Sequence, residues 1–223
     1  PGYWHWKYCE KWLAKPEEKT ADLNEIGNVG PILELPRIHV AIEPETGAAK
    51  EHALFSTQGL EFTDNKWNRL ALAVEAKADN IKADVSPLGG ERRLTVWRKS
   101  KHDLPLGPEK LFAGIAEDKF CRLILLTPAY FKAGWLPDRL LSAPEDVKVE
   151  LKAMALQRHQ LISGWDMEGA GPDGRRGCPK PTRRLVPAGT VLFLELRGAK
   201  EAIERWAQNV WFSNVSDDVQ DRL

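Results

Sequence analysis

The stretch VLFLELRGAKEAIERWAQNVW, residues 191–211, carries most of the information about the fold. Its first part, Val191 to Leu196, follows the turn signal Pro187-Ala188-Gly189 and predicts a strand. Its second part, Ala199 to Trp211, repeats apolar residues at helical spacing and predicts an amphipathic helix. A strand that leads directly into a helix favours a mixed α+β fold.

Short apolar or alternating segments predict further strands around this stretch. Phe120 to Thr127 is an apolar run that Pro128 ends, typical of a buried central strand. Val147 to Ala153 alternates apolar and charged residues, with His159 to Trp165 as its candidate pairing partner. The same patterns predict a hairpin from Arg37–Ile42 and Ala53–Ser56, a strand at Glu91–Lys99, and a half-buried strand at Trp67–Ala78, where a helix is the alternative. The sheet is expected to be mainly antiparallel.

The composition is that of a folded protein without overall charge. The chain has 223 residues, with 32 Lys+Arg and 32 Asp+Glu, and is long enough to form a core without disulfides. Three distant cysteines exclude a disulfide framework and a CxxC zinc site. The longest apolar stretch is far too short to cross a bilayer, and the first residues lack signal-peptide features.

Motifs for catalysis are weak. The five histidines never stand three or four residues apart, and no GxSxG motif occurs, so we expect no catalytic residue, metal, cofactor or small-molecule substrate. The acidic pairs Glu43/Glu45 and Asp217/Asp218 are expected to solvate turns or termini. A literal GxGxxG at residues 169–174 has no helix after it, and Gly169 to Pro181 is predicted to be an exposed, mobile loop without regular structure.

Positive charge is concentrated in two runs that contain no acidic residue. Arg92 to Lys101 holds five basic residues around Trp97, and Gly174 to Leu194 holds five more. Because the whole chain is neutral, these runs predict a polarised surface suited to a polyanion. Trp97 and Trp165 could stack on unpaired bases. The alternative is that both runs are solvated strand faces and that Trp165 belongs to the core.

Several sequence blocks resemble one known family. The most specific are ISGWD at residues 162–166 and PKPTRRLVPAGTV at residues 179–191. Residues 37–55, 88–93 and 125–137 match further pieces in the same order. The family is that of the third subunit of the type III-B CRISPR Cmr effector complex, within the RAMP superfamily, and the resemblance covers most of the chain from about residue 35 onward.

The resemblance implies an α+β, ferredoxin-like (RRM-related) architecture in two parts. Residues 1–115 would be the C-terminal part of a first ferredoxin-like domain with insertions. Residues 116–223 would be the second such domain, with a flexible loop at residues 168–182. Both ends are expected to be incomplete, because the family continues beyond them into further strands and a glycine-rich loop.

The resemblance also implies a non-catalytic, cytoplasmic subunit that binds the 5′ handle of CRISPR RNA (crRNA) and supports assembly in antiviral defence. Its partners would be the large Palm-domain subunit and the backbone RAMP subunit. Two alternatives stay open: a metal-independent endoribonuclease that processes CRISPR RNA with His39 or His52 as the acid–base group, and a protein-binding scaffold with Trp-rich surfaces.

The expected RNA-binding residues are glycines, cations and one tryptophan. The cations would contact phosphate or ribose, and the glycines would let the backbone approach RNA closely. Trp165 could instead anchor the segment that carries the second basic run. The full set is Gly89, Gly90, Arg92, Arg93, Arg98, Lys99, Gly164, Trp165, Lys180, Arg183 and Arg184.

Overall fold

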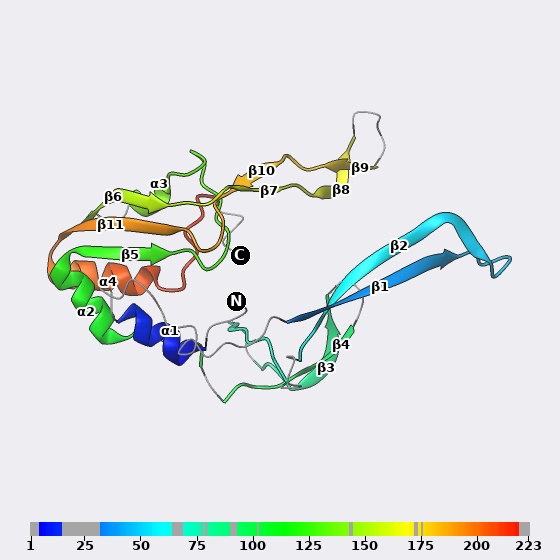
Figure 1. Ribbon diagram of the computed structural model, residues 1–223, viewed down its shortest axis with the longest axis horizontal. Helices are drawn as coiled ribbons and strands as arrows, with labels where there is room; N and C mark the ends of the chain where they lie inside the picture. Colours follow the sequence, from blue (N-terminus) through cyan, green and yellow to red (C-terminus); the bar gives the residue numbers. More distant parts are fainter. Residues whose placement is uncertain are drawn as a thin grey trace. The chain divides into compact units, whose positions relative to one another are not determined.

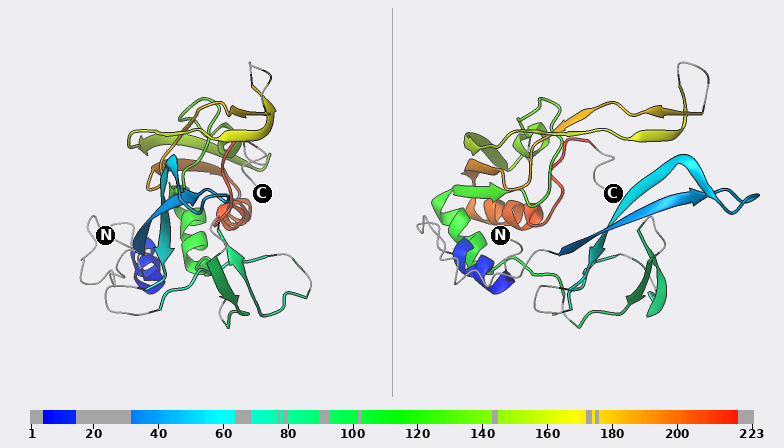
Figure 2. Two further views of the ribbon diagram at one scale, coloured as in Figure 1. Left: turned by 90° about the vertical axis from the view of Figure 1, so that its right-hand side faces the viewer. Right: turned by 45° about the vertical axis from the view of Figure 1, so that its right-hand side comes forward.

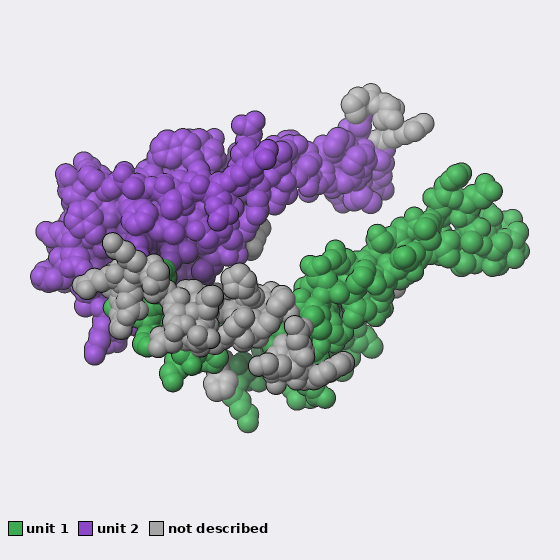
Figure 3. All heavy atoms as spheres, in the orientation of Figure 1, with its two compact units in different colours: residues 1–106 green, residues 107–223 purple. Residues whose placement is uncertain are grey.

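The chain folds into two compact units, residues 1–106 and residues 107–223 (Figure 3). The computed structural model describes residues 5–14, 32–63, 69–76, 78, 80–89, 93–101, 103–142, 145–171, 174 and 176–218. Both units combine short helices or turns with small antiparallel sheets (Figure 1). The expected α+β class with mainly antiparallel sheet is therefore confirmed.

A three-stranded sheet is the centre of the second unit. It contains β5 (Phe120–Ile124), β6 (Val147–Ala155) and β11 (Val191–Gly198) in the order β5-β11-β6, with both pairings antiparallel. The three strands predicted here are confirmed. The central strand, however, is β11 and not β5, because β11 pairs along both of its edges while β5 pairs only with β11 among the described strands.

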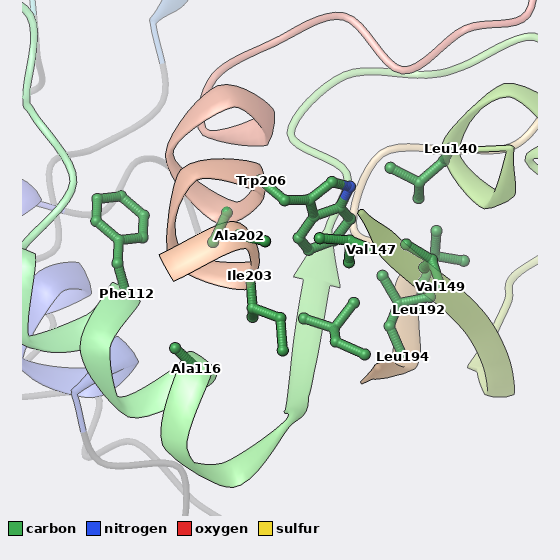
Figure 4. Packing of buried hydrophobic residues seen from close by; sticks show 12 residues of the cluster. Phe112, Ala116, Leu140, Val147, Val149, Leu192, Leu194, Ala202, Ile203 and Trp206 are labelled. Atoms are coloured by element: carbon green, nitrogen blue, oxygen red, sulfur yellow. The ribbon is translucent and has the colours of Figure 1, made fainter. Parts of the chain in front are cut away.

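Two helices cover one face of this sheet. They are α2 (Glu109–Asp118) and α4 (Lys200–Val210), so the predicted helix at Ala199–Trp211 is confirmed. Ile203 and Trp206 of α4 lie on the side of β11 that carries Leu192 and Leu194, and Phe112 of α2 belongs to the same buried cluster (Figure 4). Alternation along β11 sends these leucines to the helices and sends Phe193 and Glu195 to the opposite face.

A second, smaller cluster lies beyond the end of β5. It consists of Leu125, Ala129, Phe131 and Val186, and shares Leu123 and Val215 with the main core. A short helix, α3 (Asp138–Leu141), follows in the chain.

The C-terminal segment is fastened to this cluster by Asp217. Its carboxylate accepts backbone N–H groups of Lys132 at 2.9 Å and Arg139 at 3.1 Å, and the residue is buried. The expectation that Asp217 and Asp218 only solvate a terminus is wrong, because Asp217 satisfies backbone donors inside the unit.

A two-stranded arm, residues 160–185, extends outward between β6 and β11 in the chain (Figures 1 and 2). Nearest the sheet, β7 (Gln160–Ile162) pairs with β10 (Arg183–Leu185). Farther out, β8 (Trp165–Ala170) pairs with β9 (Arg176–Pro179). The expected pairing of residues 159–165 with residues 147–153 is wrong, because β6 pairs with β11 and β7 pairs with β10.

The glycine-rich segment at residues 169–181 is also not a continuous irregular loop. Parts of it form β8 and β9, since its glycines permit close strand contacts that other residues would block. A Cβ on Gly169 would lie 2.6 Å from Cys178 Sγ, and Gly177 adopts a φ of +97°. Glycine here allows strand pairing to continue around crowded positions.

The described residues of the first unit form α1 (Trp6–Leu13) and two hairpins. β1 (Leu33–Ile42) pairs with β2 (Ala49–Glu61), and β3 (Asp84–Leu88) pairs with β4 (Arg93–Trp97), so the predicted hairpin and the strand within residues 91–99 are confirmed. The strand predicted at residues 67–78 is wrong for its described residues. Apart from one bridge between Thr63 and Arg69 they form neither strand nor helix, and Ala71 and Ala73 interrupt the alternation that a half-buried strand needs. Within the described residues, no helix has the length and apolar character needed to cross a membrane.

Candidate nucleic-acid interface

The arm brings together five of the expected RNA-binding residues. Arg183 and Arg184 lie on β10, Trp165 begins β8, and Gly164 and Lys180 face each other between the two ladders. Arg176, from the same basic run, is exposed on β9. The second basic run therefore lies along the arm.

Arg183 points toward the body of the unit. Its Nη2 lies 3.0 Å from Oδ2 of Asp218, and its guanidinium lies 5.0 Å from the centre of the Tyr130 ring. Asp218 directly follows Asp217, which backbone donors hold in place. A cation held by an opposite charge and an aromatic face is well suited to fixing the root of the arm.

Arg184 points to the other side of the same strand. Successive side chains of a strand alternate between faces, so Arg184 lies opposite Arg183 and shares its face with Leu161, its partner on β7. Arg184 is exposed, and Leu161 is exposed beside it. The outer face of the arm root thus presents a cation next to an apolar side chain.

A backbone hydrogen bond joins Lys180 and Gly164 between the two ladders. The Lys180 N–H donates to the Gly164 carbonyl at 2.7 Å, and Ser163 Oγ donates to the Lys180 carbonyl at 3.1 Å. The Lys180 side chain is exposed. The nearby Asp166 carboxylate accepts N–H groups of Glu168 and Gly169, and these hydrogen bonds, with a smaller contribution from the charge of Lys180, hold the pKa of Asp166 below its usual value.

Trp165 lies across the backbone of β9. A Cβ added to Gly177 would fall 2.6 Å from the indole Nε1, so only glycine leaves room for the ring there. The Trp165 side chain is nevertheless 57% exposed and does not belong to either core cluster. The indole therefore braces the arm on one side and keeps a face open to solvent.

The first basic run lies in the other unit. Gly89 has a φ of +84° in the turn after β3, Arg93 begins β4, and Arg98 and Lys99 follow β4 as exposed residues. The Arg93 guanidinium lies against the backbone of Gly59 on β2, where an added Cβ would be 2.2–2.3 Å from it. Gly90 and Arg92 lie outside the described residues.

His39, a candidate acid–base group, is engaged in the β1/β2 hairpin. Its Nε2 lies 2.9 Å from Thr57 Oγ1, and its ring stacks on Phe55 with a centroid separation of 5.3 Å. These two contacts tie the imidazole to its own hairpin. Exposed His52 lies on β2, and the described residues hold no cluster of His, Cys, Asp or Glu able to bind a metal ion.

Sequence reasoning missed the contacts of Arg183 with the Tyr130 ring and the Asp218 carboxylate. Tyr130 lies within the matching block at residues 125–137, but no local pattern signals its contact with Arg183. Only the fold brings the two segments together.

Comparison with family models gives a match over nearly the whole chain. The family described as "CRISPR-associated protein (Cas_Cmr3)" matches residues 1–221. One solved chain, in the cryo-EM structure of the type III-B Cmr-beta bound to cognate target RNA, is similar with 19% identity and a TM-score of 0.38. The match covers 82% of this chain and 50% of that chain, so this chain spans about half of its length. No curated protein matches the sequence significantly.

Proposed function

Because the chain belongs to the Cas_Cmr3 family of CRISPR-associated proteins, we propose that it is a non-catalytic, RNA-binding subunit of a type III-B effector complex. It holds the 5′ handle of crRNA and supports assembly of the complex in the cytoplasm. The two units are then parts of ferredoxin-like RAMP domains, and the protein partners are the large Palm-domain subunit and the backbone RAMP subunit.

The observation that carries this proposal is the outer face of the arm. Exposed Arg184 and Lys180 lie within one short stretch of a narrow two-stranded ribbon that extends from a rigid sheet. Two cations at fixed positions suit contacts to successive phosphates of a single strand. Neither forms part of the two core clusters, so both are free of a packing role in the body of the unit.

The arm residues have two different roles in this proposal. Arg184 and Lys180 contact phosphate, and the open face of Trp165 is available to a base or ribose. Arg183 and Gly164 hold the arm in shape through Asp218 and the Lys180 backbone. In the first unit, exposed Arg98 and Lys99 add a second contact for RNA, while Arg93 packs on β2.

The experiment is a salt titration of RNA binding by the double variant Lys180→Gln and Arg184→Gln. Each lost phosphate contact on single-stranded RNA lowers the slope of log K against log salt by about 0.7, so we expect a fall of about 1.4 for the pair. The RNA is the repeat-derived 5′ handle with a fluorescent label, and the readout is anisotropy.

Arg205→Gln is the matched control. Arg205 is an exposed cation on α4 that pairs with Asp146 at 3.1 Å, on the helix side of the sheet. It should leave both the slope and the affinity unchanged. An unchanged slope in the Lys180/Arg184 variant would remove these residues, and the arm, from the RNA interface.

A further inference from the structure

We propose that the open face of the β5-β11-β6 sheet is a second part of the RNA-binding surface, where unpaired bases stack on Phe120 and Phe193. This inference rests on the proposed function, because it extends the path of the same RNA strand beyond the arm.

Both phenylalanines point away from the core. Phe193 stands between Leu192 and Leu194, which are 0% and 1% exposed against the helices, whereas Phe193 is 38% exposed. Phe120 pairs with outward-facing Glu195 and is 57% exposed. Large aromatic side chains on the uncovered face of a sheet, with helices on its other face, form a platform on which single-stranded bases can stack.

The two rings are neighbours on that face. The register pairs Phe120 with Glu195 and Arg122 with Phe193, so Phe120 and Phe193 are diagonal neighbours on adjacent strands. Such neighbours lie roughly 7–8 Å apart, which is within reach of consecutive nucleotides of one strand. On its other side Phe193 faces Ala153, whose small side chain leaves the ring partly exposed.

The charges around the rings favour RNA as the occupant. Among the described residues, Lys148, Lys152 and Arg197 form an ion-pair network with two carboxylates, those of Glu150 and Glu195. Lys152 Nζ lies 2.9 Å from the Glu195 carboxylate, and Lys148 Nζ lies 3.0 Å from that of Glu150. These contacts keep the pKa of Glu195 at about 2, mainly through the hydrogen bond from Lys152. In this network of described residues, three cations stand against two carboxylates, which leaves one positive charge in excess.

The sheet is also joined to the arm by the chain. β6 leads into β7 and β10 leads into β11 along the chain, with residues 156–159 and 186–190 as the connections between the sheet and the arm. Arg183 contacts Tyr130 and Asp218, which are attached to the core side of the unit, and alternation sends Arg184 to the opposite side. Phe193 of β11 and Arg184 of β10 therefore both face away from the core.

The test compares Phe120→Ala/Phe193→Ala with the unsubstituted chain in binding to a labelled oligoadenylate of about 12 nucleotides. Losing two stacking sites should weaken binding roughly 10- to 100-fold and leave the salt slope unchanged, because stacking neutralises no phosphate. Phe193→Trp should retain affinity. Phe193→Leu should lose it while keeping the apolar volume and the melting temperature, which separates stacking from folding.

Phe55→Ala is the matched control, because Phe55 is a similarly exposed phenylalanine on a hairpin of the other unit. It should bind like the unsubstituted chain. If Lys180→Gln/Arg184→Gln weakens binding and the phenylalanine variants do not, the second surface is overturned and the proposed function stands. If neither set weakens binding, the proposed function fails as well.

Discussion

The two units differ in where their apolar side chains lie. Every buried residue among those the structure describes belongs to residues 107–223, where α2 and α4 cover one face of a sheet. The hairpins of residues 1–106 instead expose aliphatic side chains, with Ile38 76% and Leu54 71% accessible. A two-stranded hairpin is marginal alone, whereas a sheet packed on helices is not.

The two units therefore contribute differently to stability and to binding. The second unit can hold an exposed arm in a fixed position because a core supports its root. The first unit has apolar strand faces that fit contact with other proteins, which agrees with the proposal that the chain works inside a complex. The predictions below test this contrast, from the largest expected effect to the smallest.

Substitution in the core should be most costly in the second unit. Leu194→Ala removes a side chain that is 1% exposed in the main cluster, and should lower the free energy of unfolding by about 2–5 kcal/mol. Ile38→Ala in the first unit should change it by less than about 0.5 kcal/mol. Urea unfolding followed by fluorescence measures both, and equal effects would contradict the contrast.

The Asp217 anchor should come next. Asp217→Asn replaces one acceptor oxygen by an amide that faces the backbone N–H of Lys132 or Arg139, and should cost about 1.5–3 kcal/mol. The control Asp146→Asn breaks only an exposed pair with Arg205 and should cost less than about 1 kcal/mol. Thermal and urea unfolding of the two variants measure the difference. If Asp146→Asn lowers the free energy of unfolding as much as Asp217→Asn does, the backbone hydrogen bonds of Asp217 contribute no more than an exposed ion pair.

The smallest effect concerns the root of the arm. Arg183→Asp places a second carboxylate beside Asp218 and should destabilise the unit by about 1 kcal/mol or less, since both side chains are partly exposed. The exchange Arg183→Asp/Asp218→Arg should recover part of this loss in unfolding experiments and restore RNA affinity. Recovered stability without recovered affinity would show that Arg183 itself contacts RNA.

Sequence patterns were sufficient for elements that local signals mark. Turn signals identified β11 and the β1/β2 hairpin, and helical spacing identified α4. The arm was different. Its glycines suggested a loop, and only the crowding by Cys178 and Trp165 in the folded hairpin explains why glycine is needed there.

Long-range contacts explain the remaining differences. Asp217 is 85 residues from Lys132 and 78 from Arg139, so no local pattern could indicate that its carboxylate caps their backbone donors. For the same reason, sequence could place Arg183 and Arg184 in one basic run but could not separate their roles. Only the position of Asp218 and Tyr130 assigns Arg183 to the body side.

Hydrogen exchange with and without the crRNA handle tests the central claim most directly. If RNA lies along the arm, amides of residues 160–185 should exchange more slowly when RNA is bound, while those of the β1/β2 hairpin should exchange as before. Unchanged exchange in the arm, or protection confined to the β1/β2 hairpin, would contradict the account.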